Sequence, residues 1–299
     1  MKKALILANP SSGKKLGREM AVFTEEKFEA AGWDCIVKVT QDKSDITKYT
    51  SLACQEKKDY LIIIGGDGTV SEVLNTLKHF DYRPTIGTIP TGTVNNIARG
   101  FGIELPIEKA VEQLINSRVK TCDVGSVNGQ LFLSSISAGS VPETVWEVSD
   151  DMKERYGSLA YFIEGLKSLK NEETHEVLIE LDGKSIIKEV SLLLVGVSHN
   201  ISGINNFFEE ATMNDGKLHL FLMNKTSLGE KIGIISRLMS EQNQELPPEV
   251  TIESFETARF SIRNKKNHVA MDGEKGPEFP LIVKVLPRFL TVLVPEHLI

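Results

Sequence analysis

The sequence is short of cysteine, of basic residues and of long apolar stretches, and each shortage excludes a class of protein. Its 299 residues include only three cysteines, Cys35, Cys54 and Cys122, without the CxxC spacing of redox or metal sites. The six histidines form no HxxxH pair, so a zinc site is not indicated. Lys and Arg number 34 against 41 Asp and Glu, giving a net charge of −7. This balance argues against general nucleic-acid binding, which needs a basic face.

No apolar run reaches the length of a membrane span. The run at residues 4–8 stops at Asn9-Pro10 and is too short for the apolar part of a signal peptide. The run at residues 192–197 is far below the roughly 20 residues that cross a bilayer. A hydrophobic content of 41% is enough for one large or two medium cores. We therefore expect a reduced, soluble, cytoplasmic protein.

The first third of the chain alternates between strand and helix patterns. Helical spacing separates four buried-strand patterns, at residues 3–8, 33–39, 60–64 and 85–89. Such alternation is typical of an α/β domain with a mostly parallel, doubly wound sheet. We predict a nucleotide-binding domain of this class over residues 1–120.

After residue 120 the pattern changes to strands joined by tight turns. Asn128-Gly129 and Asp182-Gly183 each stand between two strand-like runs, as in two-residue hairpins. Helical spacing covers about 143–169 and 228–239. We predict a second domain over residues 121–287, an antiparallel β-sandwich with a helical insert, and residues from about 288 to 299 are available to return to the first domain.

The stretch LIIIGGDGTVSEVL, residues 61–74, runs from a strand through glycines into a helix. Its glycines would let a phosphate approach backbone N–H groups and the positive end of the helix. It matches neither GxxxxGK[ST] nor GxGxxG, and Asp67 would repel a phosphate unless a cation lay between them. The stretch therefore favours a nucleotide polyphosphate with Mg²⁺, held by Asp67 directly or through water. The alternative is a plain corner in which Asp67 caps the helix.

Two further loops have a similar character. Residues 85–103, TIGTIPTGTVNNIARGFGI, form a second strand–turn–helix corner, where Thr93 and Asn96 would present a hydroxyl and an amide. NPSSG at residues 9–13 follows the first strand, although Asn-Pro and Ser-Gly are also ordinary turn sequences. Neighbouring corners of this type in one parallel sheet indicate a nucleotide site at the ends of the strands.

Taken together, these motifs resemble the diacylglycerol kinase catalytic family, and most closely its soluble bacterial lipid kinases. NPSSGK, GGDGT, PTGTVNNIAR, YGSLAYFIEGLKSL and the terminal MDGEKGPEFPLIVKVLPRFLTVLVP follow the family's order over essentially the whole chain. The resemblance implies an N-terminal α/β nucleotide domain and a C-terminal β-sandwich, with the active site between them. It also implies ATP- and Mg²⁺-dependent phosphoryl transfer to a lipid hydroxyl, that of diacylglycerol first, with phosphatidic acid as a product of phospholipid metabolism.

The resemblance also assigns roles to positions. Those that match the family's ATP-contacting motifs are Asn9, Pro10, Ser11, Ser12, Gly13, Thr40, Gly66, Asp67, Gly68, Thr69, Glu72, Thr93 and Asn96. Many members have Asn-Asp where this chain has Asn95-Asn96, which removes one negative charge near the phosphates.

In the second half, Asp215 of MNDGKLHL matches an aspartate that holds Mg²⁺, helped by backbone carbonyls near Thr212 and Lys217. Glu274 of MDGEKG matches the proposed general base, and with Asp67 it makes up the expected catalytic residues. On the residues alone, Asp215 and Glu274 also fit simple turns. Phosphoryl transfer to a hydroxyl needs metal-held phosphates and usually a carboxylate that accepts the proton, which favours the functional interpretation. The usual phosphate lysine is not evident, although Lys14 could contribute.

The sequence gives weaker evidence for the site that binds the lipid acceptor. Candidates for an apolar cleft, each also an ordinary core residue, are Phe132, Val141, Trp146, Phe162, Leu166, Phe207 and Phe208. Basic residues that could meet anionic headgroups, or simply face solvent, are Lys153, Arg155, Lys167 and Lys170. We expect transient peripheral contact with the inner face of the membrane, and the resemblance favours a homodimer.

Two other functions remain open. NAD kinases share the GGDGT turn and a β-rich second domain, but the PTGTVNNIAR corner and the terminal DGE motif resemble the lipid kinases. A nucleotide-binding regulator without catalysis is disfavoured by the joint presence of Asp67, Asp215 and Glu274.

Overall fold

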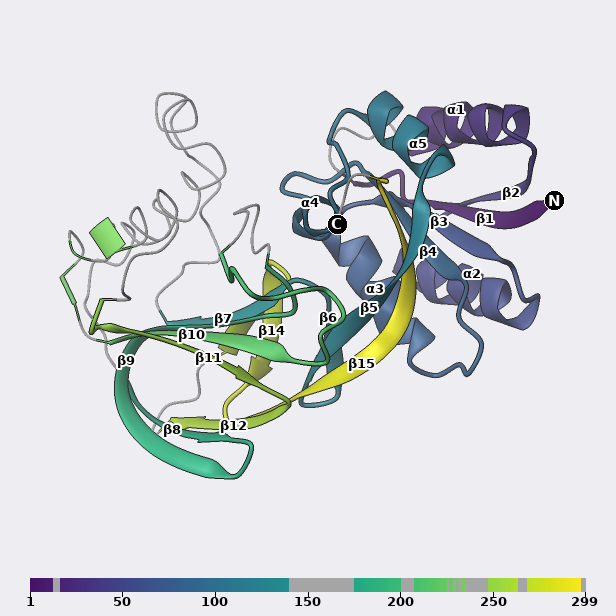
Figure 1. The fold of residues 1–299 in the computed structure, drawn as a ribbon. Coiled ribbons are helices and arrows are strands. Elements are labelled where there is room, and N and C mark those ends of the chain that lie inside the picture. Colours follow the sequence, from purple (N-terminus) through teal and green to yellow (C-terminus); the bar gives the residue numbers. More distant parts are fainter. Residues whose placement is uncertain are drawn as a thin grey trace. The chain divides into compact units, whose positions relative to one another are not determined.

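The chain folds into two compact units (Figure 1). Unit 1 consists of Met1–Cys122 and Arg288–Ile299, and unit 2 of Asp123–Pro287. The structure, a computed structural model, describes residues 1–12, 17–139, 175–199, 207–224, 226–227, 230, 233–234, 247–262 and 268–296. The helical insert expected at 143–169 lies outside these residues, as does most of the helix expected at 228–239.

Unit 1 is an α/β domain with a parallel sheet. Its strands lie in the order β15-β4-β3-β1-β2, and every neighbouring pair is parallel. Figure 1 shows α1 and α5 on one face of the sheet and α2 and α3 on the other. The strands are β1 (Lys2–Ala8), β2 (Trp33–Val39), β3 (Tyr60–Gly65), β4 (Thr85–Pro90) and the end of β15 (Leu281–Val294), and the helices are α1 (Gly17–Ala30), α2 (Lys43–Gln55), α3 (Asp67–Leu77), α4 (Asn96–Gly100) and α5 (Ile107–Ile115).

The doubly wound arrangement follows from the unbroken apolar runs of the central strands. Residues 4–8 of β1 and 61–64 of β3 are completely buried, because helices cover both faces of the sheet. Asp42 begins α2 by accepting hydrogen bonds from Ser44 N and Asp45 N, at 2.7 and 3.3 Å. The predicted fold class of this half is confirmed.

Unit 2 is built from antiparallel strands. Its two predicted hairpins are present, with Asn128-Gly129 and Asp182-Gly183 both at positive φ, as a tight two-residue turn requires. Asp272-Gly273 forms a third turn of this kind. The strands are the end of β5 (Arg118–Val127), β6 (Gln130–Phe132), β7 (Ser135–Gly139), β8 (His175–Leu181), β9 (Lys184–Gly196), β10 (Leu218–Asn224), β11 (Val250–Phe255), β12 (Thr257–Ile262), β13 (His268–Met271), β14 (Glu274–Glu278) and the first part of β15.

The long strand β9 pairs with different strands along its two halves. Its first half pairs with β8 and its second half with β7 and β10, and Figure 1 shows it strongly curved. The buried core contains side chains from both halves, such as Val190 and Val195. Strands β11 and β12 are separated at Glu256, where the Asp182 carboxylate accepts hydrogen bonds from the N–H groups of Glu256 and Thr257. The predicted antiparallel second half is thus confirmed.

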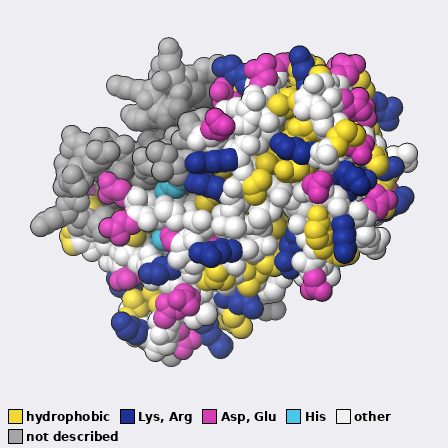
Figure 2. Space-filling view, turned by 45° about the vertical axis from the view of Figure 1, so that its right-hand side comes forward, with side chains coloured by type: hydrophobic (Ala, Val, Ile, Leu, Met, Phe, Trp, Pro, Cys, Tyr) yellow, Lys and Arg dark blue, Asp and Glu magenta, His cyan; other side chains and the backbone are white. Residues whose placement is uncertain are grey.

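Figure 2 shows basic and acidic side chains interspersed with hydrophobic ones on the face in view. Among the described residues, no helix combines the length and apolar content needed to cross a bilayer.

Cys35, on β2, is expected to react slowly with alkylating reagents. Burial, reinforced by Glu29, Glu25 and Asp34, raises the pKa of its thiol to about 12. At pH 8 the reactive thiolate would then be about 10³-fold scarcer than for an ordinary cysteine. Peptide mass spectrometry after brief iodoacetamide treatment, of native and of denatured protein, measures this difference. Labelling of native Cys35 at the denatured rate would contradict it.

Candidate active site

Three loops of unit 1 leave the sheet at the same edge. Ala8 of β1 lies opposite Ile64 of β3, and Gly65 opposite Pro90 of β4, so the three strands end together. Backbone bonds continue beyond the strands, from Asn9 N to Ile64 O and from Thr91 N to Gly65 O. The NPSSG, GGDGT and PTGT loops are therefore neighbours, as expected for parallel strands.

Glycine is required where two of these loops meet. A Cβ atom added to Gly66 would lie 3.0 Å from the Cα of Gly92, and one added to Gly92 would lie 2.7 Å from the Cα of Gly66. Behind them, a Cβ on Gly65 would be 2.7 Å from the side chain of Thr69. The glycines of GGDGT and PTGT thus allow the two turns to pack backbone against backbone.

The first loop is tied to the second by side chains. The Asn9 Nδ2 group donates to Thr69 Oγ1 at 2.9 Å, and Asn9 Oδ1 accepts from Ser11 N and Ser11 Oγ. Thr69 is only 4% exposed. Both residues were predicted to contact ATP, and in this structure they bind each other.

Asp67 joins the second loop to the third. Its Oδ2 accepts from Asn96 N and its Oδ1 from Ile97 N, each at 3.0 Å. The carboxylate therefore caps α4, a helix that begins 29 residues later in the chain. Within the third loop, Asn95, at positive φ, accepts from Gly92 N and donates to Gly92 O through its side chain, which holds that loop in shape.

The other predicted nucleotide positions have different surroundings. Thr40 is buried at the end of β2 and donates to Ala8 O. Glu72 faces α2, where it pairs with Lys43 at 3.3 Å and accepts from Thr47 Oγ1. Thr93 is exposed, and the Asn96 Oδ1 atom is buried without a hydrogen-bond partner. Pro10 and Ser12 are half-buried at the first loop, Gly68 lies in the first turn of α3, and Gly13 and Lys14 lie outside the described residues.

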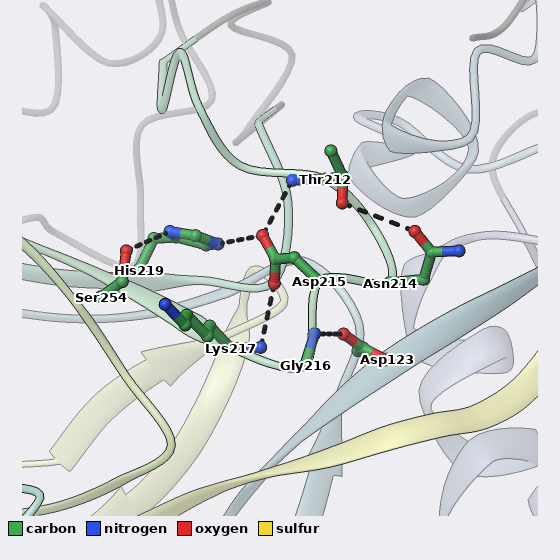
Figure 3. Close-up of polar contacts among 8 residues, drawn as sticks. All are labelled: Asp123, Thr212, Asn214, Asp215, Gly216, Lys217, His219 and Ser254. Carbon is green, nitrogen blue, oxygen red and sulfur yellow. Dashed lines mark hydrogen bonds and ion pairs between the residues drawn. The ribbon is translucent and has the colours of Figure 1, made fainter.

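In unit 2, Asp215 is surrounded by N–H donors (Figure 3). Its Oδ2 accepts from Thr212 N at 3.0 Å and lies 3.1 Å from His219 Nε2, and its Oδ1 accepts from Lys217 N at 2.9 Å. Thr212 and Lys217 thus contribute their N–H groups to Asp215. Their predicted role, to offer carbonyl oxygens to a metal, stays a prediction.

Two further residues of this network were not singled out from the sequence. Asp123 is completely buried and accepts from Gly216 N at 2.6 Å, while its own N–H donates to Met213 O. Its sequence signal is an isolated carboxylate within the strand run KTCDVGS. His219 lies opposite Ser254 in the β10–β11 pair, with its Nδ1 3.1 Å from Ser254 Oγ. Burial lowers the pKa of the His219 imidazole, although Asp215 opposes this shift.

A hydrated magnesium ion fits Asp215 on chemical grounds. A carboxylate offers about four acceptor positions, of which three are used by N–H donors. The side chain keeps 23% of its surface exposed, so the remaining position can reach solvent. Mg²⁺ commonly binds one or two carboxylates and keeps several waters. The described residues contain no cluster of three or more His, Cys, Asp or Glu side chains that would form a complete protein cage.

Glu274, the predicted base, is exposed at the start of β14, just beyond the β13–β14 turn. The turn is anchored by its neighbour Asp272, which is 2% exposed. The Asp272 carboxylate accepts from the N–H groups of residues 133, 134 and 135, at 2.8–3.0 Å. A buried carboxylate with three backbone donors holds this turn in one position, and Glu274 projects from a fixed base.

The described candidates for the lipid cleft belong to the core of unit 2. Phe132 is completely buried, and Phe207 and Phe208 pack edge to face, at 5.1 Å between ring centroids. Val141, Trp146, Phe162 and Leu166 lie outside the described residues, as do Lys153, Arg155, Lys167 and Lys170.

Comparisons with known proteins cover nearly the whole chain. The family model "Diacylglycerol kinase catalytic domain" matches residues 3–127, and "YegS C-terminal NAD kinase beta sandwich-like domain" matches residues 134–294. The chain is 33% identical to a diacylglycerol kinase of Bacillus subtilis over 99% of its own length and 98% of the relative's. It is 32% identical to one of Staphylococcus carnosus, covering 99% and 96%. A solved structure of a putative diacylglycerol kinase from Bacillus anthracis superposes with a TM-score of 0.84 at 27% identity, covering 100% and 99% of the two chains.

Proposed function

Because the chain belongs to the diacylglycerol kinase catalytic family and is a phosphotransferase of that kind, we propose that it transfers the γ-phosphoryl group of ATP to a lipid hydroxyl. Diacylglycerol is the proposed acceptor and phosphatidic acid the product. The observation that carries the proposal is the linkage of three glycine-rich loops at one sheet edge, through Asn9–Thr69, Gly66–Gly92 and Asp67–Asn96. Phosphoryl transfer depends chiefly on positioning and charge, and linked loops provide a fixed site for phosphates.

In the proposed reaction the lipid oxygen forms a bond to the γ-phosphorus while the bond to the β,γ-bridging oxygen breaks and ADP leaves. Glu274 accepts the hydroxyl proton. The loops at Ser11, Gly66 and Thr93 contact the nucleotide, and Asp67 keeps the second and third loops in register. Asp215 holds magnesium, with carbonyl oxygens near Thr212 and Lys217, and bound Mg²⁺ supplies positive charge that offsets the phosphates.

The setting of the reaction is part of the proposal. We assign ATP binding to the first domain, residues 1–120, and the lipid and metal to the second, residues 121–287. The protein would act from the cytoplasm, with transient contact to the inner face of the membrane, as a homodimer. The proposed membrane contact is supported by the proposed lipid acceptor, which resides in a bilayer. The proposed homodimer is supported by the resemblance to the family.

A parallel kinase assay tests the acceptor. We expect labelled phosphate from ATP to appear in diacylglycerol presented in mixed micelles with Mg²⁺. The panel also contains monoacylglycerol, phosphatidylglycerol, a sphingoid base, an undecaprenol-type alcohol and NAD. Transfer to another lipid alone would replace diacylglycerol as the acceptor, and transfer to NAD alone would make the protein an NAD kinase. No transfer to any acceptor would favour a catalytically silent nucleotide-binding regulator.

A further inference from the structure

His219 contacts the Asp215 carboxylate from a strand of the sheet, β10. The other two donors to the Asp215 carboxylate are the N–H groups of Thr212 and Lys217, three residues before and two after it in the same turn. These two donors belong to the turn itself, which Asp123 of β5 holds through Gly216 N and Met213 O. His219 differs from them because it binds the carboxylate directly from a strand. His219 lies in β10 between Gly196 of β9 and Ser254 of β11, and its side chain is only 6% exposed.

The proton on the imidazole follows from its partners. An ionised carboxylate can only accept hydrogen bonds, so His219 Nε2, 3.1 Å from Asp215 Oδ2, carries the hydrogen. Nδ1 is then free to accept from Ser254 Oγ at 3.1 Å. The ring also lies against Phe208, 5.4 Å between centroids. The imidazole is therefore held at both nitrogens and on one face, and Figure 3 shows the Ser254–His219–Asp215 chain from strand to turn.

We propose that His219 is the positioning residue of the magnesium site, fixing the Asp215 carboxylate so that its remaining acceptor position faces the ion. This inference rests on the proposed function, in which Asp215 binds Mg²⁺. Hydrogen-bond partners of metal ligands typically change metal affinity by 10–100-fold when they are lost. Among the described residues, His219 is the side chain that bonds to an oxygen of Asp215, and this makes it the one to test.

Two substitutions test the hydrogen bonds of the two ring nitrogens of His219 separately. In His219→Gln the amide Nε2 lies as many bonds from Cα as the imidazole Nε2, so it can still donate to Asp215. In His219→Asn the amide reaches only the position of Nδ1, toward Ser254, and Asp215 loses its donor. Both variants lose the ring and will lower the melting temperature, so stability alone does not distinguish them.

The measurement is the magnesium concentration that gives half of the Mg²⁺-dependent rise in melting temperature of the full chain without nucleotide. We expect it to rise about tenfold or more in His219→Asn and to stay within about threefold of wild type in His219→Gln. His268→Asn is the matched control, because His268 also bonds at both ring nitrogens, to Gly276 O and Glu278, in another part of unit 2. Its midpoint should not move. The KM for ATP at saturating Mg²⁺ should be unchanged in all three variants.

The outcomes separate the inference from its premise. A Mg²⁺-dependent shift in wild type that persists unchanged in His219→Asn would overturn the role of His219 and leave the metal site standing. Equal weakening in the Asn and Gln variants would show that the ring is needed for packing only, and would also overturn it. A wild-type protein with no Mg²⁺-dependent shift would remove the metal from Asp215 and the inference with it, while phosphoryl transfer in the lipid assay could still be observed.

Discussion

Glu274→Gln is expected to lower kcat by about 10²–10⁴, equivalent to roughly 3–5 kcal/mol of barrier. Glutamine keeps the length and hydrogen-bonding reach of the side chain but cannot accept the hydroxyl proton. ATP affinity should change little, since Glu274 is not assigned to the nucleotide. Steady-state kinetics on the lipid acceptor and a nucleotide Kd for the same preparation measure the two quantities.

The structure makes this substitution a clean test. Glu274 is exposed, and the turn before it is held by the buried Asp272, so the fold should not depend on the Glu274 carboxylate. Glu253→Gln is the matched control, an exposed glutamate on β11 that should leave kcat unchanged. A kcat for Glu274→Gln within about threefold of wild type would leave Glu274 a solvated turn residue. The base would then be sought at Asp67 or Asp215.

Asp67→Ala is expected to lower both turnover and stability. Two N–H groups at the start of α4 lose their acceptor, and losing a helix cap typically costs about 0.5–2 kcal/mol. The third loop is then no longer held in register with the second. A displacement of about 1 Å in a positioning site can cost on the order of 10² in rate, and loss of a metal-side carboxylate would add to this.

A matched cap elsewhere separates stability from function. Asp42 caps α2 through Ser44 N and Asp45 N, so Asp42→Ala should lower the free energy of unfolding by a similar amount while turnover stays near wild type. Thermal or denaturant melts with kcat for both variants make the comparison. If Asp67→Ala retained wild-type turnover, the link between the second and third loops would have no catalytic role, and the assignment of Asp67 to the site would fail.

Local patterns were enough to predict the fold class. The unbroken apolar runs of β1 and β3 indicated a sheet buried on both faces, and Asn128-Gly129 and Asp182-Gly183 indicated hairpins by the positive φ they tolerate. Each of these signals lies within a few neighbouring residues. The parallel direction of the strands also follows from their alternation with helices.

The hydrogen bonds that hold the candidate site residues together could not be predicted from local sequence patterns. Asp67 could be predicted as a helix cap, but the helix it caps starts 29 residues away and becomes its neighbour only when β3 and β4 pair. His219 and Ser254 meet across strands 35 residues apart, and Asp123 reaches Gly216 over 93. Such contacts are set by tertiary pairing, which leaves little trace in local sequence beyond an isolated polar residue in an apolar strand.

The path of β15 has a consequence for how the protein is made. Its first residues pair with β12 in unit 2, whereas Val292 pairs with Ile86 of β4 in unit 1, beside a Thr85–Thr291 contact of 3.0 Å. On the ribosome, residues 1–122 emerge first, yet β4 has no strand on its outer side until about residue 294 has been synthesised. Throughout translation of unit 2, the nascent chain carries an open strand edge, which is a template for wrong pairing. The half of the protein that is synthesised first is thus among the last to be completed.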